Sequence, residues 1–370
     1  MEKGRLAELD SLRGLAALSV VLFHFQSFWE RAKLPIWERV GVLGPLRLVS
    51  SGHEAVLLFF LMSGFVLSIP QIQGRAQSYG VFLTRRVFRI WAPYLAALAL
   101  AVLGAAIFHG PLPFSQWANN TWSRPVDPML VLQHVLFLGQ YDHSQFNTAF
   151  WSLIIEMRIS LIFPFVCALT LWMKPRFALG TAALITIASY LVNLRFPRYN
   201  GIVVTIHFIS LFMVGILLAK HQAGISAFYR KLGRWSKAGL AGLSLLAYAY
   251  GTLGVDGNHL IVSDWLPSAG AVGIIVFTLN SVPLRVLLLT GPARYLGTIS
   301  YSVYLLHGTV LFALVHLLYR QVPILAVFPL YLVTTLILSA GFYRYVEKPA
   351  MDAGRWIGNY LEPAKRRNAA

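Results

Sequence analysis

The chain has 370 residues, of which 57% are apolar and only 12% are charged, and its mean hydropathy is +0.64. Soluble domains carry about 25% charged residues, so this composition excludes an ordinary soluble protein and predicts an all-α polytopic membrane protein. The net charge of +17 would suit nucleic-acid binding, but the distribution of the basic residues argues against that function.

About ten apolar segments are long enough to cross a membrane. With a cytoplasmic N-terminus, most of the 31 Lys and Arg residues fall on the inner side, as the positive-inside rule requires, and both termini are then cytoplasmic. The basic excess therefore reflects topology, and no nucleic-acid partner is expected. We expect one transmembrane domain over residues 1–345 and a short basic cytoplasmic tail over 346–370. The predicted spans cover residues 11–29, 54–70, 90–109, 149–173, 177–194, 202–219, 238–254, 265–281, 299–319 and 325–345.

The first span carries two ionisable residues, Arg13 and His24, eleven positions apart. At 100° per residue they lie within about 20° of each other on a helix, and the rise between them is about 16 Å. Arg13 would then lie at a membrane surface and His24 inside the bilayer. Because an ionisable group at that depth is costly, His24 is a candidate functional residue. In the second span, the pair Ser63–Gly64 predicts a tight helix-packing site.

Three arginines precede the third span in the segment TRRVFRIWAPY. Arg86 and Arg89 are three positions apart, so they are neighbours on one helix face, and Arg85 adds a third charge. Guanidinium groups bind phosphate well, which favours a phosphate clamp at the cytoplasmic mouth of a pore. Ordinary flanking charge on the cytoplasmic side remains an alternative.

The widest interruption between spans covers residues 110–148 and faces outside in this topology. Its apolar stretch 129–138 is too short to cross a bilayer, so we expect it to be re-entrant or interfacial. Trp117 and Trp122 in this loop, and Trp37 in the loop before the second span, could stack on a sugar ring or belong to the interfacial aromatic belt.

Glu156 is the only acid that we expect well inside a span, about 10 Å below the outer edge of its helix. It should therefore lie at a depth similar to that of His24. A carboxylate can fix the tautomer of a histidine and stabilise its protonated form, as a general base needs. The alternative is a structural ion pair of Glu156 with Arg158 or with Arg13.

Near the end of the chain, Tyr301, Tyr304 and His307 recur every three residues and form a polar stripe on an apolar helix. They could line a substrate pore, or they could make hydrogen bonds between helices. His207 and His316 also lie in predicted spans, and each is expected to be a core histidine with its hydrogen bonds satisfied.

Several motifs are absent from the sequence, including a P-loop, a G-x-S-x-G elbow and H-E-x-x-H. His53 and Glu54 are adjacent, but no cluster of further ligands surrounds them, so no metal site is predicted.

Taken in order, these segments resemble the membrane acyltransferase-3 family, over almost the whole chain. In that family a second acid and a Gln-aromatic pair often follow the position of Glu156, whereas Met157 and Arg158 follow it here, so a two-carboxylate site is not expected. The matching pieces are LDSLRGLAALSVVLFHF, FFLMSGFVLS, RRVFRIWAPY, WSLIIE, LGTISYSVYLLH and YRYVEKPAM.

The resemblance implies a multi-pass enzyme of the inner (plasma) membrane that transfers an acyl group, usually acetyl, from cytoplasmic acyl-CoA to a hydroxyl of a carbohydrate. The acceptor would be an envelope or exported polysaccharide or glycolipid, and no metal is implied. Arg86 and Arg89, assisted by Arg85, would hold the CoA phosphates. His24 would act as general base or carry the acyl group transiently. Arg13 would line the pore below His24, and Glu156 would orient it.

Two other functions fit the same features. A transporter or flippase for a glycolipid or small organic acid would also have many spans and buried ionisable groups, but an inverted repeat, which would support it, is not visible. A non-catalytic scaffold of an envelope-polysaccharide complex is the other alternative, and it would not depend on His24.

Overall fold

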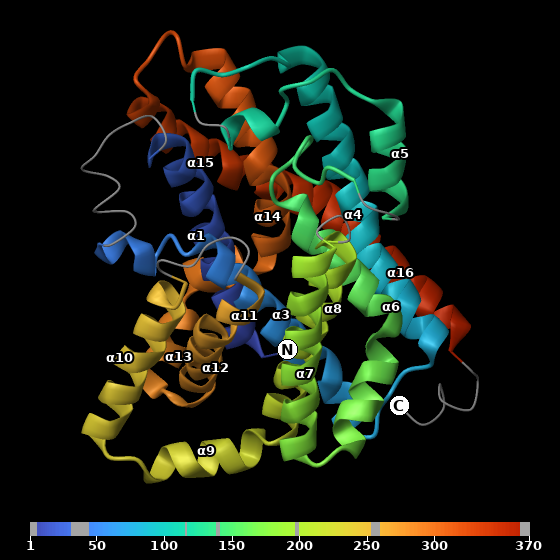
Figure 1. Cartoon of the computed structure of the whole chain (residues 1–370), viewed down its shortest axis with the longest axis vertical. Coiled ribbons are helices and arrows are strands. Elements are labelled where there is room, and N and C mark those ends of the chain that lie inside the picture. The colour runs from blue at the N-terminus through green and yellow to red at the C-terminus, as the bar shows by residue number, and fades with distance from the viewer. Residues whose placement is uncertain are drawn as a thin grey trace. The chain divides into compact units, whose positions relative to one another are not determined.

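The structure is a computed structural model, and it describes residues 6–30, 44–114, 117–137, 141–196, 200–252 and 260–362. The described residues form helices and connecting turns with no strand among them, which confirms the all-α prediction (Figure 1). The elements are α1 (Ala7–Glu30), the 3-10 helix η2 (Pro45–Leu48), α3 (Gly52–Ile72), α4 (Tyr79–Phe108), the 3-10 helix η3 (Ala118–Asn120), α5 (Pro128–Leu136), α6 (Phe150–Trp172), α7 (Pro175–Arg195), α8 (Asn200–Lys220), α9 (Gln222–Lys231), α10 (Arg234–Tyr250), α11 (Leu260–Ser263), α12 (Trp265–Asn280), α13 (Val282–Leu288), α14 (Gly291–Leu318), α15 (Ile324–Phe342), the π-helical η6 (Tyr343–Glu347) and α16 (Lys348–Leu361).

Within the described ranges, nine helical segments are long and apolar enough to cross a bilayer, so the chain is a polytopic membrane protein. The difference from the ten expected spans lies at 238–254, where α10 has only 17 residues and ends at Tyr250. A span needs about 20 apolar residues, and residues 253–259 lie outside the described part of the chain. The short stretch 129–138 contains the nine-residue α5, which is too short to span, as predicted; Leu138 is not among the described residues.

The last helical segment extends beyond the predicted span, because α15, η6 and α16 follow one another without a break. The predicted tail 346–370 is therefore helical as far as Leu361, and residues 363–370 lie outside the described ranges. The described chain divides into two compact units. The first comprises Met1–Val20, Leu43–Ala76 and Ile162–Ser300, and the second comprises Val21–Val42, Gln77–Leu161 and Tyr301–Ala370.

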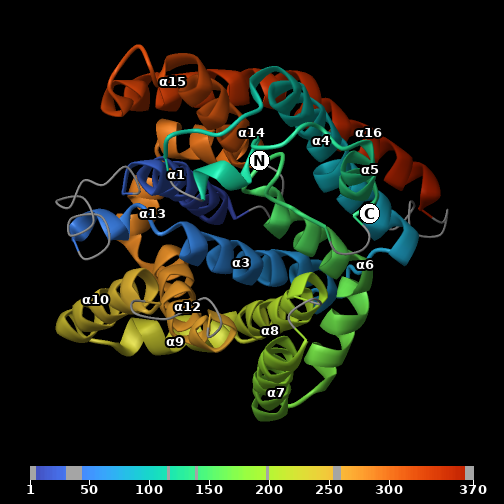
Figure 2. The same cartoon turned by 45° about the horizontal axis from the view of Figure 1, so that its top comes forward.

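In the first unit, α8 packs against α3 and α7, and α12 packs against α10 and α3 (Figure 2). Two glycines allow α3 and α8 to touch along their backbones. A Cβ atom at Gly64 would lie 2.8 Å from Phe212 Cα, and one at Gly215 would lie 2.9 Å from Phe65 N. Both distances are too short for real carbon contacts, so the predicted packing site at Ser63–Gly64 is confirmed.

In the second unit, α16 runs alongside α4 (Figures 1 and 2). Gly354 of α16 faces Phe88 of α4, and Gly358 faces Arg85. A Cβ atom added at Gly358 would lie 3.0 Å from Arg85 Nε. Arg85 Nη2 donates to Asn359 Oδ1 at 2.7 Å. The helix α16, as far as Leu361, is thus packed within the second unit.

Candidate active site

Two histidines from different helices meet in the second unit. His24 of α1 and His307 of α14 are both buried, with 8% and 0% of their surfaces exposed, and His24 Nδ1 lies 3.0 Å from His307 Nε2. The same two helices also meet in the first unit, where a Cβ at Gly14 would lie 2.6 Å from Gly297 N. Each histidine follows its glycine by ten residues in the sequence.

The hydrogen bonds of His307 assign the protons of both rings. His307 Nδ1 lies 3.1 Å from Val303 O and 2.8 Å from Tyr304 O. A carbonyl can only accept, so His307 Nδ1 carries a hydrogen and donates it. Burial in an apolar helix disfavours a charged ring, which leaves His307 Nε2 as an acceptor. His24 Nδ1 must then be the donor, and the lone pair of a neutral His24 is on Nε2. This is the tautomer that a general base requires.

In the described part of the loop 110–148, an aromatic side chain packs on this pair. Trp117 stacks on His24, with ring centroids 5.6 Å apart and planes at 24°. Trp122 does not face a ligand, because it is fully buried and donates its indole N–H to Phe146 O at 2.9 Å. Of the three tryptophans considered for sugar stacking, Trp122 is therefore excluded, and Trp37 lies outside the described residues.

The same loop contains two histidines outside the nine spans, His134 and His143, of which His134 is fully buried. His134 Nε2 lies 3.2 Å from Asp142 O and therefore donates to it, while His134 Nδ1 accepts from Tyr94 OH at 2.8 Å. Burial lowers the pKa of His134 to about 4, and burial together with the charge of Arg158 lowers the pKa of His143 to about 4. Burial likewise raises the pKa of Tyr141 above its usual value.

The tyrosines of the polar stripe make hydrogen bonds to neighbouring helices. Tyr301 OH donates to Ile90 O at 2.8 Å, and Tyr304 OH lies 2.6 Å from Ser152 Oγ. Asn147 supports the start of α6 beside α14, because its Nδ2 donates to Leu305 O at 3.1 Å. This pattern accords with the interhelical alternative for both tyrosines, and it places Tyr304 one turn from His307.

Two arginines of the predicted phosphate clamp, Arg86 and Arg89, form ion pairs with carboxylates. Arg86 Nη2 pairs with Glu156 Oε1 at 2.8 Å, and Arg86 Nε donates to Ser160 Oγ at 3.1 Å. Arg89 Nη1 pairs with Glu347 Oε1 at 2.6 Å, and Ser302 Oγ donates to Glu347 Oε2 at 2.6 Å.

Two of these contacts were not among the sequence predictions. Glu156, which was expected to orient His24, pairs with Arg86, and His24 lies beside His307. Glu347, which is fully buried, lies past residue 345, where the last span was predicted to end. Arg13 belongs to the first unit, where its Nη1 lies 3.3 Å from Asp10 Oδ1.

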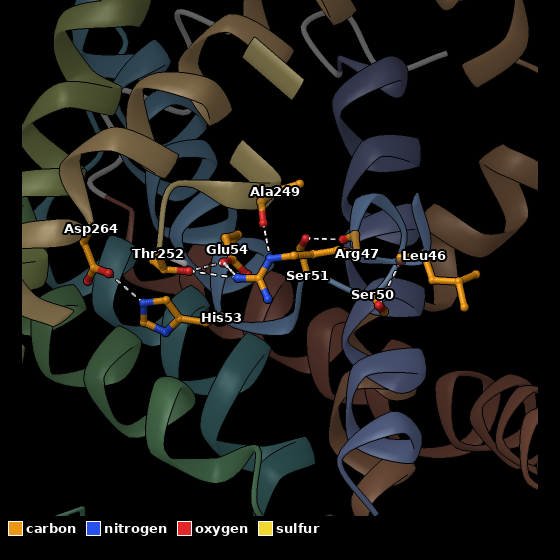
Figure 3. A network of polar contacts seen from close by, with 9 residues as sticks. All are labelled: Leu46, Arg47, Ser50, Ser51, His53, Glu54, Ala249, Thr252 and Asp264. Atoms are coloured by element: carbon orange, nitrogen blue, oxygen red, sulfur yellow. Dashed lines mark hydrogen bonds and ion pairs between the residues drawn. The ribbon is translucent and has the colours of Figure 1, made fainter. Parts of the chain in front are cut away.

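A second polar cluster lies in the first unit (Figure 3). Asp264 is shared by two histidines, with His53 Nε2 at 2.6 Å from Oδ1 and His207 Nε2 at 3.1 Å from Oδ2. Beside it, Glu54 accepts from Arg47 Nη2 at 3.0 Å and from Thr252 Oγ1 at 2.7 Å, and Arg47 Nε also donates to Ala249 O.

The sequence reasoning named His53 and Glu54 as an adjacent pair and His207 as a core histidine, and it missed the cluster. The feature of the sequence that could have indicated the cluster is Asp264, an acidic residue directly before the apolar segment that begins at Trp265. In the ranges that the structure describes, no three His, Cys, Asp or Glu side chains are arranged so that they could hold a metal ion.

Together, the fold and the histidine pair define a polytopic membrane protein with a buried imidazole suited to base catalysis. The acyltransferase domain of the acyltransferase-3 family matches residues 6–344, and the chain belongs to this family. It is thus an enzyme, a membrane O-acyltransferase. No solved structure matches the chain.

Curated relatives carry names that agree with this family. The O-acetyltransferase PaAT-1 of Phomopsis amygdali is 22% identical over 94% of this chain and 83% of its own length. The acyltransferase MdmB of Streptomyces mycarofaciens is 27% identical over 83% of this chain and 79% of its own length. The O-acetyltransferase OatA of Staphylococcus aureus is 22% identical over 94% of this chain, which spans only 58% of the length of OatA.

Proposed function

We propose that this enzyme transfers an acyl group, in the simplest case acetyl, from cytoplasmic acyl-CoA to a hydroxyl of an envelope or exported carbohydrate at the inner (plasma) membrane. The observation that carries the proposal is the His24–His307 pair, which holds a neutral imidazole with its basic nitrogen defined inside a membrane span. The O-acetyltransferase names of two relatives support the acetyl group.

His24 acts as the general base. His24 Nε2 removes the proton of the acceptor hydroxyl while the hydroxyl oxygen attacks the thioester carbonyl. The tetrahedral intermediate collapses, the carbon–sulfur bond breaks, and the CoA thiolate takes the proton back from Nε2. During the step His24 is a cation, and its Nδ1–H donates to His307 Nε2, which stabilises that charge and keeps the ring in place. In this proposal His307 is the residue that positions His24.

The arginines bind the CoA phosphates in this proposal, with unequal roles. The Arg89 side chain is 38% exposed, whereas that of Arg86 is 13% exposed. Arg89 can therefore meet a phosphate with little rearrangement. Arg86 would have to exchange Glu156 for the phosphate, so it contributes mainly by fixing α4 against α6. Arg85 is held by Asn359 and assists from the same helix face.

The sidedness rests on the distribution of Lys and Arg, which places the start of α4 in the cytoplasm. The donor then enters from the end of α4 that carries Arg86 and Arg89. The loop with Trp117 faces the opposite side, where an exported carbohydrate is available.

The test is acyl-CoA-dependent product formation by the purified protein in detergent. His24→Ala should abolish transfer and CoA release. His307→Phe should lower kcat about a hundredfold, the lower range of general-base contributions, and His307→Gln should recover part of the loss because its amide oxygen can accept from His24 Nδ1–H. Near-normal transfer by His24→Ala would refute the mechanism. A transporter would release no CoA at all.

A further inference from the structure

A cavity of about 310 Å³ lies in the second unit where α4 and α14 end. It is separate from the histidine pair, and neither the family nor the proposed chemistry assigns it a role. Its wall combines aromatic rings, imidazoles and one guanidinium. The residues that matter here are Phe108, His109, Leu112, His316, Tyr319 and Arg320.

His316 supplies the feature that points to a ligand. Its Nδ1 lies 2.8 Å from Phe312 O and must donate to that carbonyl, so a neutral His316 has its lone pair on Nε2. This nitrogen is buried and has no hydrogen-bond partner among the described residues. The ring is held by aromatic neighbours, with centroids 5.8 Å from Trp122 and 6.2 Å from Phe108. A buried acceptor without a partner is rare in native proteins, and the side chain that carries this one is among those that line the cavity.

The lining selects the kind of ligand. An acceptor nitrogen requires a donor, which is a hydroxyl or an ammonium group. Arg320 and His109 disfavour a cation, so a hydroxyl fits better. Phe108 and Tyr319 add apolar faces against which the C–H groups of a sugar ring can pack, and Arg320 adds donors for ring and hydroxyl oxygens.

His316, which lines the cavity, and His307 of the histidine pair belong to the same helix, α14, so the distance between them is fixed. α4 and α14 run parallel, because Tyr301 bonds to Ile90 and, further along both helices, His316 meets Phe108. His316 follows His307 by nine residues, which is a rise of about 14 Å. Phe312 lies between them and contacts both Trp117, at 6.3 Å, and Trp122, at 5.9 Å.

We infer that this cavity is a subsite for a sugar ring of the acceptor, one that lies beyond the ring whose hydroxyl is acylated. The inference rests on the proposed function. The separation of about 14 Å is more than one sugar ring covers, so the subsite contributes binding energy only when the acceptor is a chain of sugars. Such remote contacts improve the reaction of long substrates and leave short ones unaffected.

The test compares two acceptors made from one source, the envelope polysaccharide of the producing cells after mild alkaline removal of its acyl groups. One sample is left as long chains and the other is hydrolysed to single sugars. His316→Phe keeps the aromatic packing and removes the acceptor nitrogen. We expect it to raise KM for the chains by about three- to tenfold, the effect of one lost hydrogen bond, with unchanged kcat and unchanged kinetics on single sugars.

Two further variants make the result specific. His316→Gln keeps an acceptor atom and should recover most of the affinity for the chains. His221→Phe alters a histidine that lines a different cavity, in the first unit, and should change neither KM. An unchanged KM of His316→Phe for chains that the wild type acylates would overturn this inference alone. Absence of acyl transfer by the wild type to either sample would overturn the proposed function as well.

Discussion

Replacing Gly64 with alanine would add one methyl group where α3 touches the backbone of α8. The new Cβ would lie 2.8 Å from Phe212 Cα and 2.9 Å from Phe212 C, and backbone atoms cannot move aside as the end of a flexible side chain can. Overpacking of this kind costs about 1–3 kcal/mol. Alanine also favours a helix over glycine by about 1 kcal/mol, and this gain partly conceals the steric cost.

Gly180 on α7 provides the matched control, because nothing lies within 4 Å of a Cβ added there. Gly180→Ala should be neutral or stabilising by up to about 1 kcal/mol. The difference in unfolding free energy between the two variants isolates the steric cost of about 1–3 kcal/mol. Cys167 is the single cysteine and is buried, so a maleimide dye that fluoresces on reaction reports unfolding during a temperature ramp. If Gly64→Ala melted at or above the temperature of Gly180→Ala, the direct backbone contact of α3 and α8 would be wrong.

Three further outcomes are expected. The pKa of His134 lies near 4, below the unfolded value of about 6.5, so the unfolded chain binds more protons between these values. The protein should therefore lose stability as the pH falls from 6.5 towards 4, and His134→Gln should show a smaller loss between pH 7 and pH 5 in the dye assay. Asp264→Asn removes the charge shared by His53 and His207 and should cost about 3 kcal/mol, measured by the same melting. Arg89→Ala should raise KM for acyl-CoA at least about tenfold and change kcat little, as the loss of ground-state binding does. Steady-state kinetics measures both constants. A fall in kcat with an unchanged KM would contradict a role of Arg89 in binding the CoA phosphates.

The sequence is sufficient to predict the helical spans, because long apolar runs in a bilayer must satisfy their backbone hydrogen bonds internally. The two discrepancies occur at helix ends. α10 stops at Tyr250, inside the predicted span, whereas the last helix continues past residue 345 as far as Leu361. Hydropathy averages over a window and does not mark the residue at which a helix ends or continues. The missed buried acid, Glu347, is a direct consequence.

For the site, expected depth in the membrane made His24 a candidate but did not indicate its neighbour His307. Glu156 and His24 were expected at similar depth, yet Glu156 pairs with Arg86 and His24 with His307. Which side chain faces another depends on where two helices cross and on how each is rotated about its axis. Nothing in the spacing of polar residues along one helix carries that information.

The helix α14 gathers the parts of the proposed reaction at fixed intervals. Ser302 bonds to Glu347, which holds Arg89; His307 holds His24; and His316 lines the outer cavity. The rise from Ser302 to His307 is about 8 Å, and from His307 to His316 about 14 Å. A phosphate bound at Arg89 therefore lies more than one helical turn from the imidazoles, a gap that only a slender arm of the donor can bridge. Because one rigid helix sets both intervals, a change in the length of α14 between these positions should abolish transfer even where every side chain is retained.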